Sequence, residues 1–355
     1  MAETWRLLDT GLASAARNVA LTRALLEARD AEEITSTLRF VRFAPSVLLA
    51  CRESAAQAVD LAECARLEVA VQRRLSGGAT WFVDERQLGW ELYLSRRDVA
   101  DADMRSISRR VVHAAATAIS ALGPDARYRS PDVIEVDGRT LCWTAHAAEG
   151  RAVVVQGVLL ADVDYERAAR VLRLPVALLS PGAVAALRAR LASLKEVLGR
   201  PPDLAAFRVN LAEAFESEFD IELRESDLGL SEHARYSRAL LEVDTAGWVD
   251  FVVRPVADVC LVEAARAVRG GELAACVRYE PAARAIREVW FSGAAGLQPA
   301  RALCDLEALL TDLPVSRLAR QVEAFFASGA VHAQHADPRD FVAVVELATG
   351  QPLVA

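Results

Sequence analysis

The sequence predicts a mixed α+β protein made of two domains. Its 355 residues exceed the usual length of one domain. The expected strands come in antiparallel runs between helices, not in regular strand–helix–strand repeats. The pattern of elements restarts near residue 246, and Gly270-Gly271 precedes a further group of strands and helices. We therefore expect one domain over residues 1–253 and a small α+β domain over residues 254–355.

The first part of the larger domain shows helical and strand spacing in turn. Apolar residues such as Val19, Leu21 and Leu25 recur at helical spacing, which predicts a helix over 13–28. Polar and apolar residues alternate over 37–43, which predicts a strand that ends before Pro45. The elements expected next are helices over 61–67 and 101–122 and strands over 69–74, 81–83 and 89–94.

The rest of the larger domain begins with a predicted hairpin. Strands over 133–136 and 140–147 flank Asp137-Gly138, a pair typical of two-residue hairpin turns. The elements expected after it are a strand over 152–160 and helices over 165–172, 181–198 and 203–219. For the small domain we expect strands over 273–279 and 286–291 and helices over 299–310 and 315–326.

Composition and charge exclude several classes of protein. The apolar fraction is 53% and the net charge is −8, which argue for a soluble globular protein without a nucleic-acid or anionic-membrane surface. No apolar run approaches the roughly 20 residues of a membrane span, and the first residues lack a secretion-signal pattern, so we expect a cytoplasmic protein. The six cysteines form no CxxC pair, and His332 and His335 have no third ligand nearby in sequence. We therefore expect reduced thiols and no metal site.

One segment combines arginines, glycines and aromatic residues. Arg73 and Arg74 lead into the turn Ser76-Gly77-Gly78, and an apolar run with Trp81 and Phe82 follows. Glycine N–H groups can approach a ligand closely, and guanidinium groups bind carboxylates and phosphates. The segment therefore predicts an anion site beside an apolar wall. Taken alone, an ordinary turn with surface ion pairs is the alternative interpretation.

This segment resembles the Arg-Arg-x-Ser-Gly-Gly-Gly loop of lipoate–protein ligases and related octanoyltransferases, the biotin/lipoate protein ligase family. Other segments similar to that family extend the resemblance over nearly the whole chain: Trp5–Leu8, the hairpin Asp132–Ala145, the strand Gln156–Leu160 and Trp290–Gly293. The resemblance implies a class II biotin/lipoate ligase-like catalytic domain followed by the family's small C-terminal accessory domain.

The resemblance also implies a reaction. Lipoate–protein ligases use ATP with magnesium to convert lipoate or octanoate into an acyl-adenylate. They then transfer the acyl group to a lysine of a lipoyl-carrier protein, either a lipoyl domain or a protein like the glycine-cleavage H protein. No cofactor would be tightly bound. The residues implied to contact substrate or ATP are Arg73, Arg74, Ser76, Gly77, Gly78, Ala79, Trp81, Phe82, Asp132, Ala145, Gly157, Val158 and Leu159.

Three positions depart from the family pattern. The third glycine of the loop corresponds to Ala79, the family lysine to Thr140, and a small glycine of the same hairpin to Trp143. Threonine offers a neutral hydroxyl where the lysine supplies a mobile positive charge. Losing one such transition-state donor typically costs about 100- to 1000-fold in rate. The single lysine of the chain, Lys195, is distant from this hairpin in sequence.

Three functional hypotheses follow. The first is an ATP-dependent lipoate–protein ligase that works with Thr140 at the lysine position. The second is a catalytically impaired protein that binds a lipoyl-carrier protein or assists a paralogous ligase subunit. The third is an octanoyl or lipoyl transferase with Cys142 as nucleophile, because some members of the superfamily use a cysteine; a buried, inert thiol is the simpler interpretation of Cys142.

Overall fold

The computed structural model describes residues 3–51, 53–97, 104–129, 133–174, 182–251, 261–269, 271–293, 297–298, 302–327, 329 and 331–350. The chain divides into two compact units. The first unit comprises Met1–Ala55, Leu61–Leu172 and Val184–Val252. The second comprises Ala56–Asp60, Arg173–Ala183 and Val253–Ala355.

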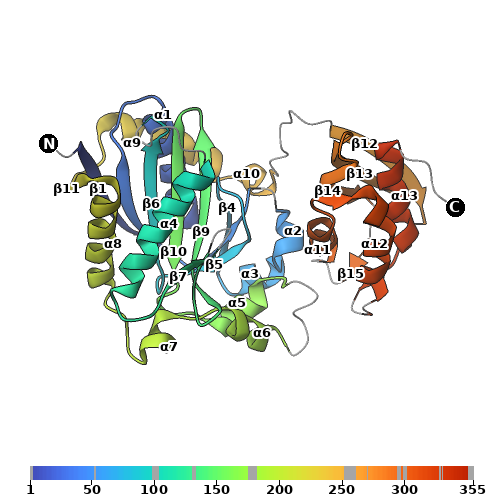
Figure 1. The fold of residues 1–355 in the computed structure, drawn as a ribbon, viewed down its shortest axis with the longest axis horizontal. Coiled ribbons are helices and arrows are strands. Elements are labelled where there is room, and N and C mark those ends of the chain that lie inside the picture. Colours follow the sequence, from blue (N-terminus) through green and yellow to red (C-terminus); the bar gives the residue numbers. More distant parts are fainter. Residues whose placement is uncertain are drawn as a thin grey trace. The chain divides into compact units, whose positions relative to one another are not determined.

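An eight-stranded sheet forms the centre of the first unit (Figure 1). Its strands in chain order are β1 (Glu3–Ala13), β2 (Thr37–Phe43), β6 (Leu88–Ser95), β7 (Arg127–Arg129), β8 (Val133–Val136), β9 (Arg139–Glu149), β10 (Ala152–Leu159) and β11 (Ile221–Glu225). The spatial order is β11-β1-β2-β6-β10-β9-β8-β7. β1 runs parallel to β2 and β11, and every other neighbouring pair in this sheet is antiparallel. The predicted hairpin corresponds to β8 and β9.

Helices cover both faces of this sheet (Figure 1). α1 (Ala15–Asp30) and α9 (Leu230–Val243) lie on one face, and α4 (Met104–Ser120) and α8 (Leu204–Phe219) lie on the other. The alternation of side chains along β10 separates the two layers: Val154 packs with α1, whereas Val153 and Val155 pack with α4 and α8. Because helices cover both faces of the sheet, β6 and β10 are buried along their whole length.

A second, three-stranded sheet carries the arginine–glycine loop. Its central strand β3 (Ser46–Leu49) pairs parallel with β4 (Ala70–Arg73) and antiparallel with β5 (Trp81–Val83). Trp81 and Val83 pack against Val41 and Phe43 of β2 and against Val158 of β10. This packing fixes the loop between β4 and β5 beside one end of α1 and the main sheet.

Shorter helices complete the first part of the chain: α2 (Ala55–Ala58), α3 (Leu61–Arg66), α5 (Tyr165–Val171), α6 (Ala183–Arg190), α7 (Leu194–Leu198) and α10 (Ala246–Asp250). The prediction of one helix over 181–198 is wrong. The backbone N–H of Ala192 donates to Thr140 O at 2.9 Å, and that of Leu194 donates to Leu160 O at 2.7 Å. These bonds hold the chain against the ends of β9 and β10, and Ser193 then caps a separate helix, α7.

The second unit has its own sheet and core. Its sheet has the order β12 (Leu261–Val268), β13 (Gly271–Glu280), β14 (Ala285–Gly293) and β16 (Leu313–Pro314), with antiparallel pairing throughout. The helices packed against it are α11 (Ala302–Leu309), α12 (Leu318–Ala327) and α13 (Pro338–Thr349). A 3₁₀ turn spans Val315–Arg317, and β15 (Leu297–Gln298) pairs with β17 (His332–Ala333). The sequence predicted β13, β14, α11 and α12 but not β12 or α13. Across both units, none of the described helices is long and apolar enough to cross a membrane.

Candidate functional site

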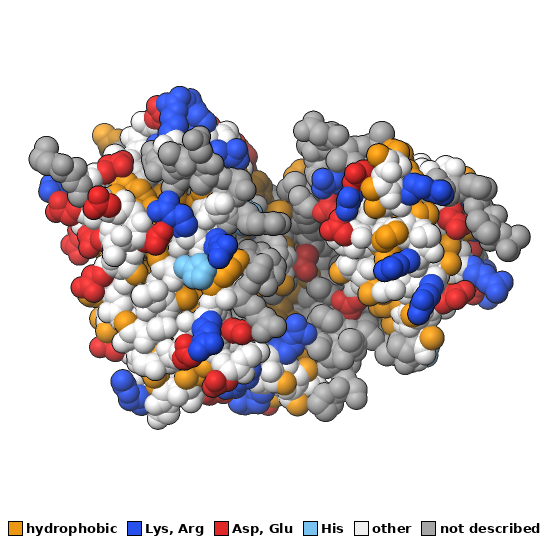
Figure 2. Space-filling model, viewed as in Figure 1, with side chains coloured by type: hydrophobic (Ala, Val, Ile, Leu, Met, Phe, Trp, Pro, Cys, Tyr) orange, Lys and Arg blue, Asp and Glu red, His pale blue; other side chains and the backbone are white. Residues whose placement is uncertain are grey.

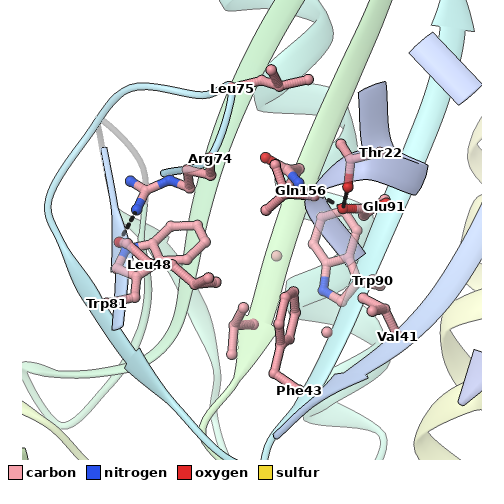
Figure 3. A pocket seen from close by; sticks show the side chains of 14 residues that line it. Thr22, Val41, Phe43, Leu48, Arg74, Leu75, Trp81, Trp90, Glu91 and Gln156 are labelled. Carbon is pink, nitrogen blue, oxygen red and sulfur yellow. Dashed lines mark hydrogen bonds between the residues drawn. The ribbon is translucent and has the colours of Figure 1, made fainter. Parts of the chain in front are cut away.

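A narrow cavity lies in the first unit where α1, the main sheet and the three-stranded sheet meet (Figure 3). Most of its wall is apolar and comes from Val19, Val41, Phe43, Leu48, Leu75, Trp81, Trp90 and Val158. The polar side chains in the wall are Arg74 on one side and Thr22, Glu91 and Gln156 opposite it (Figure 3). The cavity measures about 20 Å³, whereas a benzene-sized ligand needs an apolar cavity of about 150 Å³. An eight-carbon chain would therefore need wall side chains to move.

The indole ring of Trp90 is one reason why the cavity is so small. A Cβ at Gly157 would lie 2.1 Å from Trp90 Cε2, so the ring rests directly on the backbone of β10. Glycine is therefore required at position 157 by close packing. Gly157 thus contacts Trp90 and also lines the cavity.

Arg74 projects into the wall of the cavity and is almost fully buried. Its Nη1 donates to Leu48 O at 2.8 Å, and its Nη2 donates to Gly77 O at 2.6 Å and Ala79 O at 2.7 Å. Its Nε donates to Ser76 Oγ at 3.0 Å, and its guanidinium stacks on the Trp81 ring at 3.9 Å. The loop thus turns carbonyl groups toward this cation.

The charge of Arg74 has no ion-pair partner among the described residues, because every hydrogen-bond acceptor around it is a carbonyl or hydroxyl group. Burial is the largest influence and lowers the pKa of Arg74 to about 10, although the Glu53 and Cys51 side chains act to raise it. Four of its five N–H groups are engaged, which leaves one N–H for a further acceptor. Buried charges in proteins are normally paired, so this site is suited to an anion.

The neighbouring Arg73 has a different position. Its Nε and Nη2 donate to Val249 O at 3.0 and 2.6 Å, and its Nη1 donates to Ala50 O at 2.7 Å. It does not line the cavity, and burial lowers its pKa. Because successive strand residues face opposite ways, only one of the two arginines can reach the cavity. Arg73 ties the three-stranded sheet to α10.

A buried hydrogen-bond network extends from the loop into the main sheet. The Ser76 hydroxyl donates to Gln156 Oε1 at 2.8 Å, and Gln156 Nε2 donates to Glu91 Oε1 at 2.6 Å. Glu91 Oε2 forms an ion pair with Arg39 at 2.8 Å and accepts a hydrogen bond from the Tyr93 hydroxyl. Burial is the largest single influence and lowers the pKa of Arg39, but the Glu91 and Tyr93 side chains together outweigh it and the net shift is upward.

Trp143 is stacked on Trp81 beside the cavity. The two ring centroids are 5.9 Å apart and the planes differ by 7°. Trp143 pairs in register with Val158, which is itself part of the cavity wall. A stack of three groups thus fills the space between the two sheets: the guanidinium of Arg74, the indole of Trp81 and the indole of Trp143.

The two residues proposed for catalysis lie elsewhere on β9. Thr140 pairs with Glu135 and bridges to Leu191, and it is not part of the cavity wall. Cys142 is fully buried in the core with α4 and α8. Burial raises the pKa of the Cys142 thiol to about 12, so the thiol stays protonated at neutral pH. This environment does not support a nucleophilic role for Cys142.

The remaining predicted residues divide by their position. Trp81 and Val158 line the cavity, as do Arg74 and Gly157. Those outside its wall are Arg73, Ser76, Gly77, Gly78, Ala79, Phe82, Ala145 and Leu159. Gly78 has φ +92, and a Cβ there would lie 3.4 Å from Arg74 Nη2, so glycine fits this turn. Asp132 lies outside the described residues.

Sequence reasoning did not assign roles to the polar residues opposite Arg74. Thr22 Oγ1 donates to Glu91 Oε1 at 2.8 Å, and both line the cavity with Gln156. Two features of the sequence could have revealed these residues: Glu91 stands in an otherwise apolar strand, and Gln156 stands in a run of valines. A polar residue inside a strand that is covered on both faces needs a buried partner.

The surface of the first unit carries charges of both signs on the face drawn in Figure 2. Arg110, for example, pairs with Glu218 at 2.7 Å. The single lysine, Lys195, pairs with Asp162 at 2.8 Å, and its side chain is 51% exposed. Within the described part of the chain, no group of three or more His, Cys, Asp or Glu residues is placed to hold a metal ion.

Comparison with known proteins decides the family. A family model, the lipoyl protein ligase A/B catalytic domain, matches residues 14–216, more than half of the chain. The chain belongs to the lipoyl protein ligase A/B family. The predicted membership of the biotin/lipoate protein ligase family is therefore confirmed.

Relatives of this family member include both transferases and ligases. The octanoyltransferase LipM of Moorella thermoacetica is 24% identical over 268 residues, which cover 70% of this chain and 98% of that protein. A chain of a Thermoplasma acidophilum structure, described as a bi-partite lipoate protein ligase and its E2 lipoyl domain, matches with a TM-score of 0.64 at 20% identity. That match covers 71% of this chain and 98% of the other. P. falciparum LipL1 in complex with lipoate matches with a TM-score of 0.57 at 10% identity, covering 97% of this chain and 98% of that one.

The structural matches show the fold of this lipoyl protein ligase A/B family member. The predicted α+β class, with a lipoate ligase-like domain and a further C-terminal domain, is confirmed by them. The family comprises lipoate ligases and octanoyltransferases, which transfer acyl groups.

Proposed function

We propose that this protein binds a medium-chain acyl group, octanoate or lipoate, beside Arg74 and recognises a lipoyl-carrier protein without forming an acyl-adenylate itself. In this role it would work with a lipoyl domain or an H-like carrier, and with a paralogous ligase subunit that supplies the chemistry. It would act as a cytoplasmic protein. Membership of the family supports the acyl and carrier classes.

The observation that carries this proposal is the buried charge of Arg74, which lies in an apolar wall without an ion-pair partner among the described residues. Its four engaged N–H groups point to neutral acceptors, and one N–H remains. A monocarboxylate with an apolar tail supplies the missing negative charge and fits the apolar side chains around it.

The residues of this chain give less support to acyl activation. A triphosphate needs several free donors, but the Ser76 hydroxyl and most Arg74 N–H groups are already used within the protein. Thr140 supplies no positive charge at the position implied for the family lysine. These residues therefore favour binding of the acyl group over its activation with ATP.

Calorimetric titration of the full chain with sodium octanoate tests the binding proposal. The wild type should bind, and Arg74→Met should weaken binding about 10- to 100-fold because it removes a charged hydrogen bond worth about 1.5–3 kcal/mol. Arg73→Met is the matched control, since it removes an equally buried guanidinium outside the cavity. Equal loss in both variants, or no binding by the wild type, would contradict the proposal.

The activation step needs a separate assay. We expect no pyrophosphate release from ATP with lipoate or octanoate, while an immobilised apo lipoyl domain should retain the protein. Pyrophosphate release above the background of Arg74→Met would show that the protein is an active ligase instead.

A second candidate is ATP-independent octanoyl transfer, which the relative named octanoyltransferase LipM favours. In such a transfer a thiolate attacks the thioester carbonyl of the donor and releases the donor thiol. The carrier lysine then attacks the new thioester and regenerates the protein thiol. Transfer from an octanoyl thioester donor to an apo lipoyl domain would support this candidate, and loss of transfer in Cys142→Ser would assign the thiol to Cys142.

A further inference from the structure

A line of hydrogen bonds connects the cavity wall to the buried ion pair of the main sheet. It runs from Arg74 Nε to Ser76 Oγ at 3.0 Å, from Ser76 Oγ to Gln156 Oε1 at 2.8 Å, and from Gln156 Nε2 to Glu91 Oε1 at 2.6 Å. Figure 3 shows Gln156 and Glu91 joined across the cavity from Arg74. Gln156 is the middle member and is 8% exposed.

The direction of each bond in this line follows from the ion pair. Glu91 forms the ion pair with Arg39 at 2.8 Å, and the oxygens of an ion-paired carboxylate accept only, so Gln156 presents its NH₂ group to Glu91. The Gln156 carbonyl oxygen then faces Ser76, whose one proton must be donated to it. The free lone pair of the Ser76 hydroxyl is thereby turned to the Arg74 N–H.

We propose that Gln156, oriented by Glu91, is a positioning residue that holds the Arg74 guanidinium for its ligand through the Ser76 hydroxyl. The inference rests on the proposed binding of a carboxylate at Arg74 and adds the residue that determines how that cation is oriented. Without Gln156 the Ser76 proton can rotate toward other acceptors, and the Nε contact that fixes the plane of the guanidinium is weakened. The cation is then no longer fixed over the Trp81 ring, 3.9 Å from its centroid, in the cavity wall.

The first test measures octanoate binding to the full chain by calorimetry. Gln156→Ala should weaken binding about 10-fold, which is the effect of one buried hydrogen bond. Gln87→Ala is the matched control. Gln87 is also buried, at 2%, and donates to Asp162 O, but none of its hydrogen bonds involves Ser76. Equal weakening in both variants would overturn the proposal, because it would indicate a general loss of structure.

A double-variant cycle separates positioning from direct contact, since Gln156 itself lines the cavity. If Gln156 acts through Ser76, then Gln156→Ala combined with Ser76→Ala should weaken octanoate binding no more than either change alone. Additive losses would overturn the relay through Ser76.

A spectroscopic readout that needs no ligand completes the test. The full chain labelled with 5-fluorotryptophan gives a ¹⁹F signal for Trp81, assigned with Trp81→Phe, that responds to the guanidinium stacked on it at 3.9 Å. Gln156→Ala should shift this signal and Gln87→Ala should not. An unchanged signal in Gln156→Ala would refute the positioning role. If the wild type binds no octanoate but the signal shifts, the proposed function fails and the positioning of Arg74 stands.

Discussion

Replacing Trp143 by alanine should open the acyl site at a measurable cost in stability. The indole is half-buried and stacks on Trp81 at 5.9 Å. Truncating a fully buried Trp costs about 3–5 kcal/mol, and the partial burial here places the expected loss near 2–3 kcal/mol. For a unit of the size of the first one, that corresponds to a melting temperature roughly 4–6 °C lower.

The same change should tighten octanoate binding. With Trp143 removed, Trp81 can move away from the wall of the 20 Å³ cavity and admit more of the alkyl chain. Each methylene newly buried contributes about 0.8 kcal/mol, so three of them correspond to roughly a 50-fold lower Kd. Calorimetry with sodium octanoate measures this gain, and scanning calorimetry measures the stability loss.

The control variant is Trp248→Ala, which removes another half-buried indole, on α10, away from the cavity wall. It should lose stability without any gain in octanoate binding. A folded Trp143→Ala protein that binds octanoate no more tightly than the wild type would refute the view that the aromatic stack restricts the site.

Three further predictions concern the core around this site. Because burial raises the pKa of Cys142 to about 12, only about one thiol in ten thousand is ionised at pH 8, and peptide mapping after DTNB treatment should find Cys142 unmodified until the protein is unfolded. Breaking the buried ion pair with Arg39→Met should leave Glu91 uncompensated and lower the free energy of unfolding by about 3–5 kcal/mol in urea titrations; a loss below about 1 kcal/mol would contradict the pairing. Gly157→Ala places a methyl group 2.1 Å from a buried indole and should destabilise by about 1–3 kcal/mol or more, whereas Gly77→Ala meets nothing within 4 Å and should stay within about 0.5 kcal/mol of the wild type.

Local patterns in the sequence predicted most elements of the first unit. Strand β2 begins and ends where its alternation indicated, and the Asp137-Gly138 turn joins β8 and β9 as expected. The sequence did not predict that β11 pairs with β1, because this pairing joins segments more than 200 residues apart. Such long-range pairing leaves no local periodic signal.

The candidate site was less predictable than the fold. The arginine pair was recognisable, but only the strand geometry distinguishes Arg74 in the cavity wall from Arg73 against α10. The position of Arg39 was even harder to predict from the sequence, because the alternation of polar and apolar residues in β2 is typical of a half-exposed strand. In the structure this side chain is fully buried, since its partner Glu91 comes from a strand 52 residues away. Partners of buried charges are identified by tertiary structure and not by spacing.

The lone lysine has a consequence for any reactive acyl compound that reaches this protein. Lys195 is the one lysine of the chain, and its Nζ lies 2.8 Å from Asp162 Oδ2. Arginine stays protonated at physiological pH, so its guanidinium group does not act as an amine nucleophile. Lys195 is therefore the one side-chain amine of the chain that an activated acyl group could modify. A chain with so few amines offers an acyl group few targets for self-acylation.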